Sequence, residues 1–293
     1  MLVGTKEMLE DAQFNHYAIG AFNVENLEFV MAVIKAAEAQ NSPVIMQTTP
    51  GTLRYVDCDY FFAMVANAAH DSRVPVALHL DHGDSYERCC QALRAGYTSV
   101  MIDGSQKPFD ENIALTKRVC DMASAMEVCV EAELGKVGGK EDDAPSVEGQ
   151  GVYTDPEEAK TFVDATHCSS LAVGVGTAHG VYKGTPHIQQ EVLKSIREVV
   201  DIPLVLHGTS GVPNEQVVEA IKNGVCKVNY ATELRQVYSK GYSDYQKTNP
   251  DVFDPKKPAA QGIDRLYKLV CAHMENLGSV NRAESVFSRI INR

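Results

Sequence analysis

Short apolar segments rich in β-branched residues recur along the chain, and each is followed by a longer segment with a different hydrophobic spacing. Nearly continuous apolar runs of this kind are typical of strands in a parallel sheet that helices cover on both faces. The sequence contains eight such runs, at residues 17–24, 43–48, 75–82, 99–104, 127–134, 170–175, 203–208 and 226–232.

The segments between these runs have the features of helices. Apolar side chains within residues 26–40 fall on one helical face. Residues 155–165 begin with Asp-Pro-Glu-Glu, which supplies a capping residue, a proline at the first helical position and an acidic first turn. Residues 213–224 begin with a proline and end in Asn-Gly, a typical helix stop. Eight strand–helix units predict an α/β protein, a (β/α)8 TIM barrel that occupies residues 1–293 as a single domain.

Two segments interrupt this alternation. Residues 135–152 are rich in glycine and acidic residues and have no periodicity, and a segment of this length after a barrel strand is a candidate lid. Residues 233–279 begin as a helix, pass through NPDVFDPKKP and end in another helix, which predicts a C-terminal helical extension. The last residues, 284–293, form an extra C-terminal tail to which the pattern assigns no role.

Composition narrows the classes of function. The formal net charge is −12, and an acidic chain without a stripe of Lys and Arg does not suit nucleic acid. The N-terminus lacks the pattern of a signal peptide, and no apolar stretch approaches the ~20 residues of a membrane span, so no membrane partner is expected. The eight cysteines are scattered and form no CxxC motif, which favours reduced thiols and a cytoplasmic protein.

Polar residues gather where the predicted strands end. In a barrel these carboxyl ends meet on one face, where barrel enzymes have their active sites. The residues concerned are Asp81, His82, Asp103, Glu131, Glu133, His179, His207 and Asn229.

Three histidines of this set, His82, His179 and His207, are the candidate metal ligands. Three neutral imidazoles leave one open position on a tetrahedral zinc ion, which is the pattern of a catalytic site. His79 lies deeper on the same strand as His82 and is interpreted as a packed or supporting residue. Adjacent residues face opposite sides of a regular strand, so His82 and Asp81 can both reach the site only if the strand gives way to a loop near Gly83.

The carboxylates allow two interpretations. Asp103 and Glu133 together would form a second cation position, although Asp103 could equally cap the next helix. Glu141 and Asp142 lie in the candidate lid, where they are either functional groups or charges that promote solubility.

Glycine-rich loops follow the predicted sixth and seventh strands at residues 176–180 and 207–211, and residues 229–232 follow the eighth. Backbone N–H groups of such loops, next to a helix N-terminus, form a site for phosphate. The loops after the last strands are a frequent phosphate site in this fold.

The chain resembles the class II fructose- and tagatose-bisphosphate aldolases over nearly its whole length. The segments that carry the resemblance are YAIGAFNVENLE, PVALHLDHG, SVMIDGS, VEAELGKVGGKEDD, GTAHGVYKG, PLVLHGTSG, KVNYATEL and NLGSVNRA. The resemblance implies a lyase that uses Zn2+ to cleave a ketose 1,6-bisphosphate reversibly. The products would be dihydroxyacetone phosphate and glyceraldehyde 3-phosphate.

The resemblance also implies a role for each matching position. Asp81 would take the proton from the C4 hydroxyl, and Glu141 would move a proton on the dihydroxyacetone phosphate carbon, with Asn229 also in the catalytic set. The implied metal residues are His82, His179 and His207 for zinc, with Asp103 and Glu133 as an alternative or second divalent site. The implied substrate and phosphate contacts are Asn23, Thr49, Gly180, Lys183, Gly208, Thr209, Ser210, Asn229, Tyr230, Ala231, Thr232, Arg235 and Lys256. In this family a monovalent cation, Na+ or K+, often assists at the phosphate site.

Two positions depart from the family pattern. Many fructose-specific members have an acidic or amide residue where this chain has Ala231, which is closer to the tagatose type. Lys256 stands where the family commonly has an arginine that reaches the distal phosphate in a neighbouring subunit. Lysine keeps the charge but not the bidentate geometry, so the aldehyde partner stays open. A residue that serves a neighbouring subunit would require a homo-oligomer, and we expect a homodimer or homotetramer.

The same residues argue against other functions. A class I aldolase needs a Schiff-base lysine, but strand 170–175 has none and Lys227 lies deeper than a reacting group should. A barrel that only binds sugar phosphates would not need the acid/base pair of Asp81 and Glu141. A class II aldolase for a related deoxy-sugar phosphate stays open, as does the choice between fructose and tagatose. Cobalt or manganese would also suit the ligands.

Overall fold

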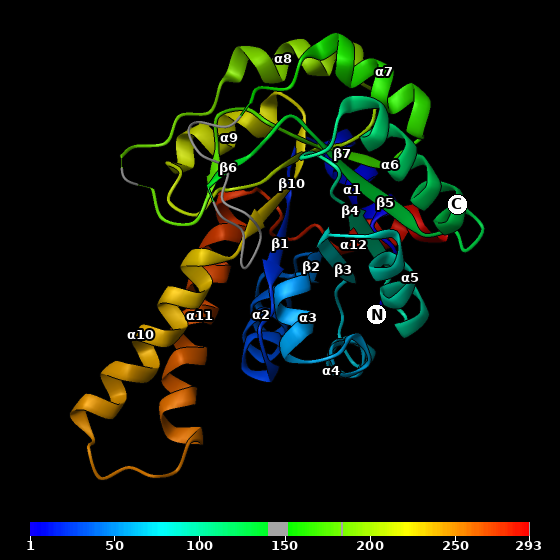
Figure 1. The fold of residues 1–293 in the computed structure, drawn as a ribbon. Coiled ribbons are helices and arrows are strands. Elements are labelled where there is room, and N and C mark those ends of the chain that lie inside the picture. Colours follow the sequence, from blue (N-terminus) through cyan, green and yellow to red (C-terminus); the bar gives the residue numbers. More distant parts are fainter. Residues whose placement is uncertain (140–151, 183, 293) are drawn as a thin grey trace.

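The computed structural model describes residues 1–139, 152–182 and 184–292, and its parallel strands close into a barrel (Figure 1). Each barrel strand pairs with the preceding and the following barrel strand, and β10 closes the barrel on β1. The eight barrel strands are β1 (Ile19–Asn23), β2 (Val44–Thr48), β3 (Val76–Gly83), β4 (Ser99–Ile102), β5 (Cys129–Leu134), β7 (Ser170–Val173), β9 (Leu204–Leu206) and β10 (Val225–Tyr230). Each predicted run overlaps one barrel strand, and the predicted TIM barrel is confirmed.

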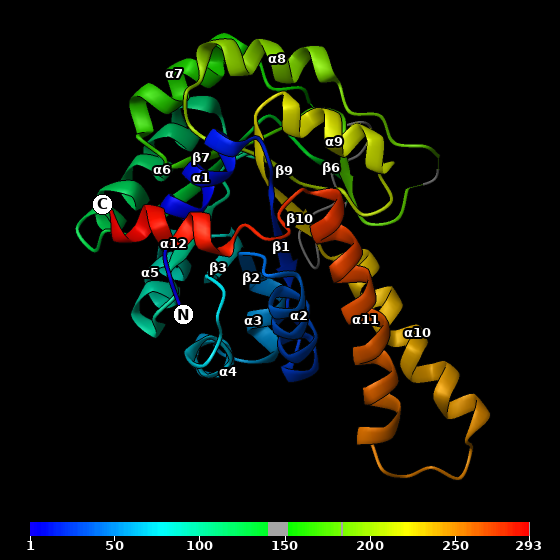
Figure 2. The ribbon, with the colours of Figure 1, turned by 180° about the vertical axis from the view of Figure 1, so that it is seen from behind.

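Helices surround the barrel in Figures 1 and 2. They are α2 (Leu27–Gln40), α3 (Pro50–Tyr55), α4 (Cys58–His70), α5 (Tyr86–Ala95), α6 (Phe109–Ser124), α7 (Pro156–Thr166), α8 (Gln190–Val199) and α9 (Asn214–Lys222). The predicted helices 26–40, 155–165 and 213–224 correspond to α2, α7 and α9. Asp155 caps α7 as its sequence indicates, because its carboxylate accepts from the backbone N–H groups of Glu157 and Glu158.

A pair of short strands at the rim was not predicted. Gly138–Gly139 (β6) and Ala178–His179 (β8) pair in parallel as a separate two-stranded sheet. These strands join the start of the candidate lid segment to the loop that contains His179. Most of the candidate lid, including Glu141, lies outside the described residues, as does Lys183.

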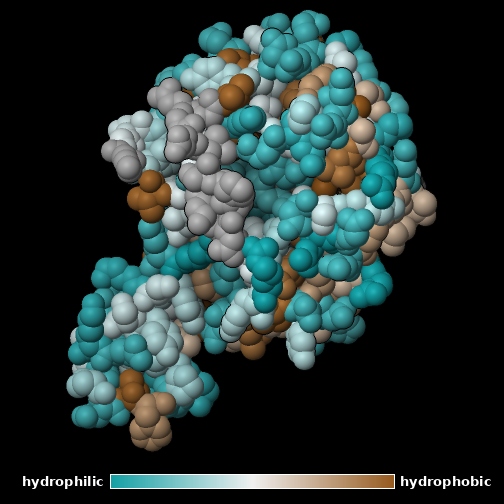
Figure 3. Space-filling model, in the orientation of Figure 1, coloured by the Kyte–Doolittle hydropathy of each residue, from teal (hydrophilic) through white to brown (hydrophobic). Residues whose placement is uncertain are grey.

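The C-terminal extension is a helical hairpin, α10 (Thr232–Thr248) and α11 (Lys256–Asn276), as the sequence predicted. The two helices pack side by side and project from the barrel as an arm (Figures 1 and 2). The side chain of Phe253, in the turn at the far end, is 96% exposed. Apolar atoms are visible at this end in Figure 3.

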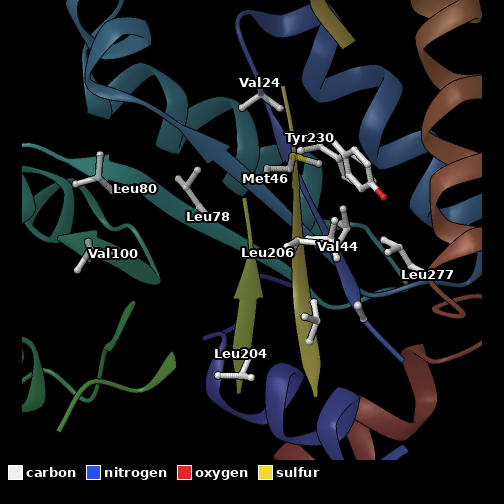
Figure 4. Close-up of a cluster of buried hydrophobic side chains, with 14 of the residues drawn as sticks. Val24, Val44, Met46, Leu78, Leu80, Val100, Leu204, Leu206, Tyr230 and Leu277 are labelled. Carbon is white, nitrogen blue, oxygen red and sulfur yellow. The ribbon is translucent and has the colours of Figure 1, made fainter. Parts of the chain in front are cut away.

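Two hydrophobic clusters hold the fold together. One fills the space between the sheet and the surrounding helices, and Figure 4 shows part of it, with Leu78, Leu80, Leu204 and Leu206 among its members. The other fills the amino-terminal end of the barrel interior. It combines α1 (Lys6–Asn15) and the inward-facing strand residues Ile19, Ala21, Ile45, Ala77 and Cys226.

The last helix, α12 (Ala283–Ile291), accounts for the tail that the sequence left without a role. Its Val286 is fully buried in the cluster with α1, and Ser285 donates a hydrogen bond of 2.7 Å to Asp11 of that helix. The tail therefore closes the end of the barrel opposite to the strand carboxyl ends. None of the helices in the described part of the chain has the length and apolar character that crossing a membrane requires.

Candidate active site

Asp81 and His82 both face the mouth of the barrel because β3 bulges at this point. The pairing of β3 with β4 shifts register between Leu80 and Gly83, and His82 has a left-handed backbone with φ of 46°. A bulge adds a residue on one strand, so two adjacent side chains can be brought to one face. A Cβ on Gly83 would lie 2.3 Å from the carbonyl oxygen of Met101, so only glycine fits there. The strand thus continues to Gly83, where the sequence suggested a loop.

The three candidate ligands converge. Nδ1 of His207 lies 3.0 Å from Nε2 of His82, and the imidazole of His179 stands edge-on to that of His82 with ring centroids 5.0 Å apart. One nitrogen from each ring lies within 4.8 Å of the others. Burial, reinforced by the positive charge of His82, lowers the pKa of His179 and of His207 well below the usual value. Both rings are therefore neutral, which is the form that binds a metal.

Carboxylates stand behind two of these rings. Nδ1 of His82 is 2.8 Å from Oδ2 of Asp103, and Nε2 of His207 is 2.9 Å from Oε1 of Glu131. Each carboxylate contacts the ring nitrogen on the side away from the converging pair. This arrangement orients metal-binding histidines and sets their tautomers. Burial opposes ionisation of Asp103, but the hydrogen bond and charge of His82 outweigh it and lower the pKa of Asp103.

Glu133 provides a test of whether a cation fits. Its Oε2 is buried 3.4 Å from Nδ1 of His207, without a hydrogen-bond partner among the described residues. Burial, with the nearby charge of Asp103, raises the pKa of Glu133 well above the usual value. An orphaned carboxylate oxygen beside converging imidazoles is what a divalent cation would satisfy, so the residues fit a metal.

A second group of possible ligands consists of His82, Asp103 and Glu133, the residues predicted for an alternative metal position. It uses the opposite ring nitrogen of His82, Nδ1 instead of Nε2. Because one neutral imidazole offers one lone pair, the two positions exclude each other unless the ring loses both protons.

Asp81 is held by two side-chain amides. Its Oδ2 accepts from Nε2 of Gln47 at 3.0 Å, and its Oδ1 accepts from Nδ2 of Asn229 at 3.0 Å. Gln47 also donates to Oδ1 of Asn23 at 2.8 Å. Burial raises the pKa of Asp81. A buried carboxylate with a raised pKa and a fixed orientation is suited to proton transfer.

A pocket of about 280 Å3 lies beside Asp81 and contains most of the predicted phosphate residues. The hydroxyl of Thr209 donates to the carbonyl of Asn229, and α10 begins at Thr232, so the N-terminus of that helix lies at the pocket. Such a helix end favours an anion. Tyr182 joins the loops on either side, because its hydroxyl accepts from the N–H of Ala178 at 2.6 Å and donates to the carbonyl of Gly208 at 2.7 Å. The lining residues are Asn23, Asp81, His179, Gly180, Gly208, Thr209, Ser210, Asn229, Ala231 and Thr232.

Four residues from the predicted contact set lie elsewhere. The side chain of Tyr230 points into the outer core, where it stacks on Phe22 and His273, so only its backbone can face the site (Figure 4). Thr49 caps α3. Arg235 pairs with Glu25 at 2.6 Å. Lys256 begins α11 at the far end of the arm and pairs with Asp254, so it does not reach the pocket of its own chain.

Three residues of the site were not assigned a role from the sequence. Gln47 orients Asp81, Glu131 contacts His207, and Nζ of Lys227 lies 2.8 Å from Oε2 of Glu131. In the sequence each of these residues is visible only as a polar side chain within an apolar run. The role of such a side chain depends on which strands lie next to it in the barrel. His79 is fully buried, with Nδ1 2.8 Å from Oγ of Ser99, in keeping with its interpretation as a packed residue.

The fold and the site together define an aldolase of the metal-dependent class. The chain belongs to the class II fructose-bisphosphate aldolase family, whose model matches residues 3–282. It is 35% identical to the YdjI aldolase from Escherichia coli K12, covering 97% of this chain and 100% of that one with a TM-score of 0.86. A proposed fructose-1,6-bisphosphate aldolase from Coccidioides immitis is 31% identical over 94% of this chain and 96% of that one, with a TM-score of 0.85. The fructose-bisphosphate aldolase Fba from Campylobacter jejuni, at 24% identity, shares the fold, with a TM-score of 0.80 over 96% of both chains.

Proposed function

We propose that this aldolase uses zinc to cleave a ketose 1,6-bisphosphate reversibly, with fructose or tagatose bisphosphate as the substrate. The products are dihydroxyacetone phosphate and glyceraldehyde 3-phosphate. The observation that supports the proposal is the convergence of three imidazoles next to Asp81, at the edge of a pocket that a helix N-terminus faces.

His82, His179 and His207 would hold the zinc ion, and Glu133 would balance its charge from the buried side. A bound zinc ion would act as a Lewis acid that stabilises the negative charge developing as the C3–C4 bond breaks. Asp81 accepts the proton of the C4 hydroxyl, since its two oxygens are aimed by Gln47 and Asn229. The charge develops in the transition state, so these contacts accelerate the reaction instead of only binding substrate.

Buried amide atoms without hydrogen-bond partners among the described residues support the proposal that the pocket binds a hydroxylated substrate. Nδ2 of Asn23 and Oδ1 of Asn229 are buried without hydrogen-bond partners among the described residues, and both side chains line the pocket. Buried polar atoms of this kind are costly unless a ligand satisfies them. We assign the triose phosphate, with a monovalent cation, to the loops at Gly208 and Thr232. Glu141 and Lys183 stay proposed contacts outside the described residues.

The distal end of the substrate is the open part of the proposal. Arg235, the predicted contact of the second phosphate, pairs with Oε1 of Glu25, while Oε2 of Glu25 accepts from the hydroxyl of Thr52 at 2.9 Å. A carboxylate next to the arginine reduces its attraction for phosphate. Ala231 lines the pocket where many fructose-specific relatives have an acidic or amide side chain. Fructose and tagatose 1,6-bisphosphate share the second phosphate and differ only in configuration at C4, so Arg235 does not distinguish them and the two sugars have to be compared directly.

We also propose that the protein is a homodimer or homotetramer in the cytoplasm. Lys256 lies on an arm that projects from its own barrel, so it can contribute to catalysis only in a second copy. Mixing a Lys256→Ala variant with an Asp81→Asn variant tests this idea. If Lys256 acts across subunits, the mixture regains activity that neither variant has alone. Full activity of Lys256→Ala by itself would mean that Lys256 has no part in the reaction, and a mixture without regained activity would mean that Lys256 does not act across subunits.

The decisive experiment measures release of dihydroxyacetone phosphate from fructose and tagatose 1,6-bisphosphate, before and after chelation and after zinc is restored. Loss with chelator and recovery with zinc establish the cofactor, and the ratio of the two kcat/KM values identifies the substrate. Asp81→Asn is the matched control, because it should retain zinc but lose turnover. No release from either sugar by the zinc-loaded protein would reject the proposed substrates in favour of a related deoxy-sugar phosphate or simple binding.

A further inference from the structure

A buried ion pair lies directly beneath the candidate metal ligands. Glu131, in the middle of β5, contacts Nε2 of His207 through Oε1 at 2.9 Å and Nζ of Lys227 through Oε2 at 2.8 Å. All three side chains are at most 2% exposed. Glu131 belongs to β5, His207 to the loop between β9 and α9, and Lys227 to β10, so the three side chains join three sides of the barrel interior. Neither Glu131 nor Lys227 lines the substrate pocket.

The contact between Glu131 and His207 fixes which nitrogen of the imidazole carries hydrogen. A carboxylate can only accept, so the neutral ring of His207 must donate from Nε2. Its Nδ1 then has a free lone pair, and that atom lies 3.0 Å from Nε2 of His82, where the ligands converge. Without Glu131 the hydrogen could reside on Nδ1 and would oppose metal binding.

Lys227 has a different task. A carboxylate removed from water is costly unless it is compensated, and breaking such a pair is strongly destabilising. Lys227 compensates Glu131 through the oxygen that does not contact His207, so the pair adds no net charge beneath the ligands. Two further titratable groups lie near Glu131: a carboxylate oxygen of Asp81 is within 4.8 Å, and Nε2 of His79 is 3.6 Å from the same Oε2. Burial lowers the pKa of His79 well below the usual value. His79 is therefore neutral beside the pair, and Lys227 supplies the counter-charge of Glu131.

We propose that Glu131 is a positioning residue that holds His207 in its metal-binding tautomer, and that Lys227 balances the charge of Glu131. The inference rests on the proposed metal function of His207. It assigns a role to two buried residues that touch neither the substrate pocket nor the converging nitrogens. Loss of a partner of this kind is expected to weaken metal binding about 10- to 100-fold.

The test compares zinc affinity in three variants, measured on folded protein by competition with a chromophoric chelator. The double variant Glu131→Gln/Lys227→Met is the informative one, because it preserves the volume and the zero net charge of the pair. An amide can donate as well as accept, so it no longer fixes the tautomer. We expect the double variant to bind zinc about 10- to 100-fold more weakly than the wild type. The single variant Glu131→Gln should bind still more weakly, because Lys227 would be left as an uncompensated charge near the metal.

Asp11→Asn is the control. Asp11 is also a buried carboxylate, 2.9 Å from the hydroxyl of Tyr17 at the opposite end of the barrel, so this variant should lose stability but retain zinc affinity. Wild-type affinity in the double variant would overturn the proposal, because the pair would then be only structural. A wild-type protein that does not bind zinc would instead reject the proposed function. A double variant with weaker zinc affinity but native thermal stability would establish the positioning role.

Discussion

Nε2 of Gln47 donates to Oδ2 of Asp81 across 3.0 Å and so joins the ends of β2 and β3 at the mouth of the barrel. The carboxylate of Asp81 is therefore held in one orientation, since Asn229 of β10 donates to its other oxygen. A proton acceptor held from both sides is already oriented when the substrate binds, so its orientation adds little to the activation free energy.

Replacement of Gln47 by leucine should lower kcat/KM for aldol cleavage about 10- to 100-fold, because small displacements of a reacting group have effects of this size. Zinc content should not change, since Gln47 contacts none of the three candidate ligands. Steady-state kinetics with metal analysis would check both expectations. Gln40→Leu removes the same amide at an exposed site, where it donates to Glu275, and should have wild-type kinetics. Equal kinetics in both variants would show that Asp81 does not need this support.

The barrel could be predicted from the sequence because its strands are buried on both faces and their runs are nearly all apolar. The bulge at His82 could not, because it arises from the register between β3 and β4 and from the close contact of Gly83 with Met101. The same limit applies to Gln47. Its polar side chain interrupts the strand VIMQT. Only the neighbouring strands show that it serves Asp81.

The orientation of Tyr230 could not be predicted from the motif for a different reason. Its neighbours in the sequence, Asn229 and Ala231, line the pocket, and motif resemblance therefore included it in the contact set. Alternation along β10 places its ring on the outer face instead, against His273. Consecutive residues of a matching motif therefore do not all contact the substrate, because their side chains lie on alternate faces of the strand.

Metal removal should lower the stability of the protein as well as its activity. Glu133 is buried with an oxygen that has no partner in the described part of the chain, and a bound cation would satisfy it. At a zinc concentration of ~100 Kd the native state gains about 2.7 kcal/mol. That gain corresponds to an increase in Tm of about 5 °C in a chain of this length. Calorimetry of chelated and zinc-restored protein would measure it.

His179→Ala provides the comparison for this experiment, because it removes a ligand from β8 at the rim and leaves the barrel strands intact. Zinc should raise the Tm of this variant by much less than that of the wild type. An equal increase in both proteins would place the stabilising ion at another site.

The C-terminal helix should contribute stability without a contribution to catalysis. Val286 of α12 is fully buried against α1 at the end of the barrel opposite to the site. Val286→Ala removes two buried methyl groups and should lower the free energy of unfolding by about 2 kcal/mol. Ile291→Ala, on the same helix but 80% exposed, should have little effect. Urea unfolding with kinetic assays would separate the two variants, and a large loss of kcat in folded Val286→Ala would contradict this role.

Buried tyrosines should make the protein less stable at alkaline pH. Burial raises the pKa of Tyr97 far above the usual tyrosine value, and its hydroxyl lies 2.8 Å from that of Thr48. Above the unfolded-state pKa of about 10, the unfolded chain loses the phenolic proton while the native protein keeps it. The native state then binds more protons than the unfolded state, so stability is complete below pH ~10 and falls as the pH rises. The slope for one tyrosine is about 1.4 kcal/mol per pH unit.

Tyr97→Phe removes this titration and should make the decline shallower by about 1.4 kcal/mol per pH unit above pH ~10. At neutral pH it should cost only about 1 kcal/mol, for the hydrogen bond lost by Thr48. Tyr55→Phe is the matched control, since Tyr55 is 77% exposed and should leave the pH dependence as in the wild type. Urea unfolding from pH 9 to 11 would measure the three curves. Parallel curves for Tyr97→Phe and the wild type would mean that Tyr97 ionises equally readily in the folded and unfolded chains.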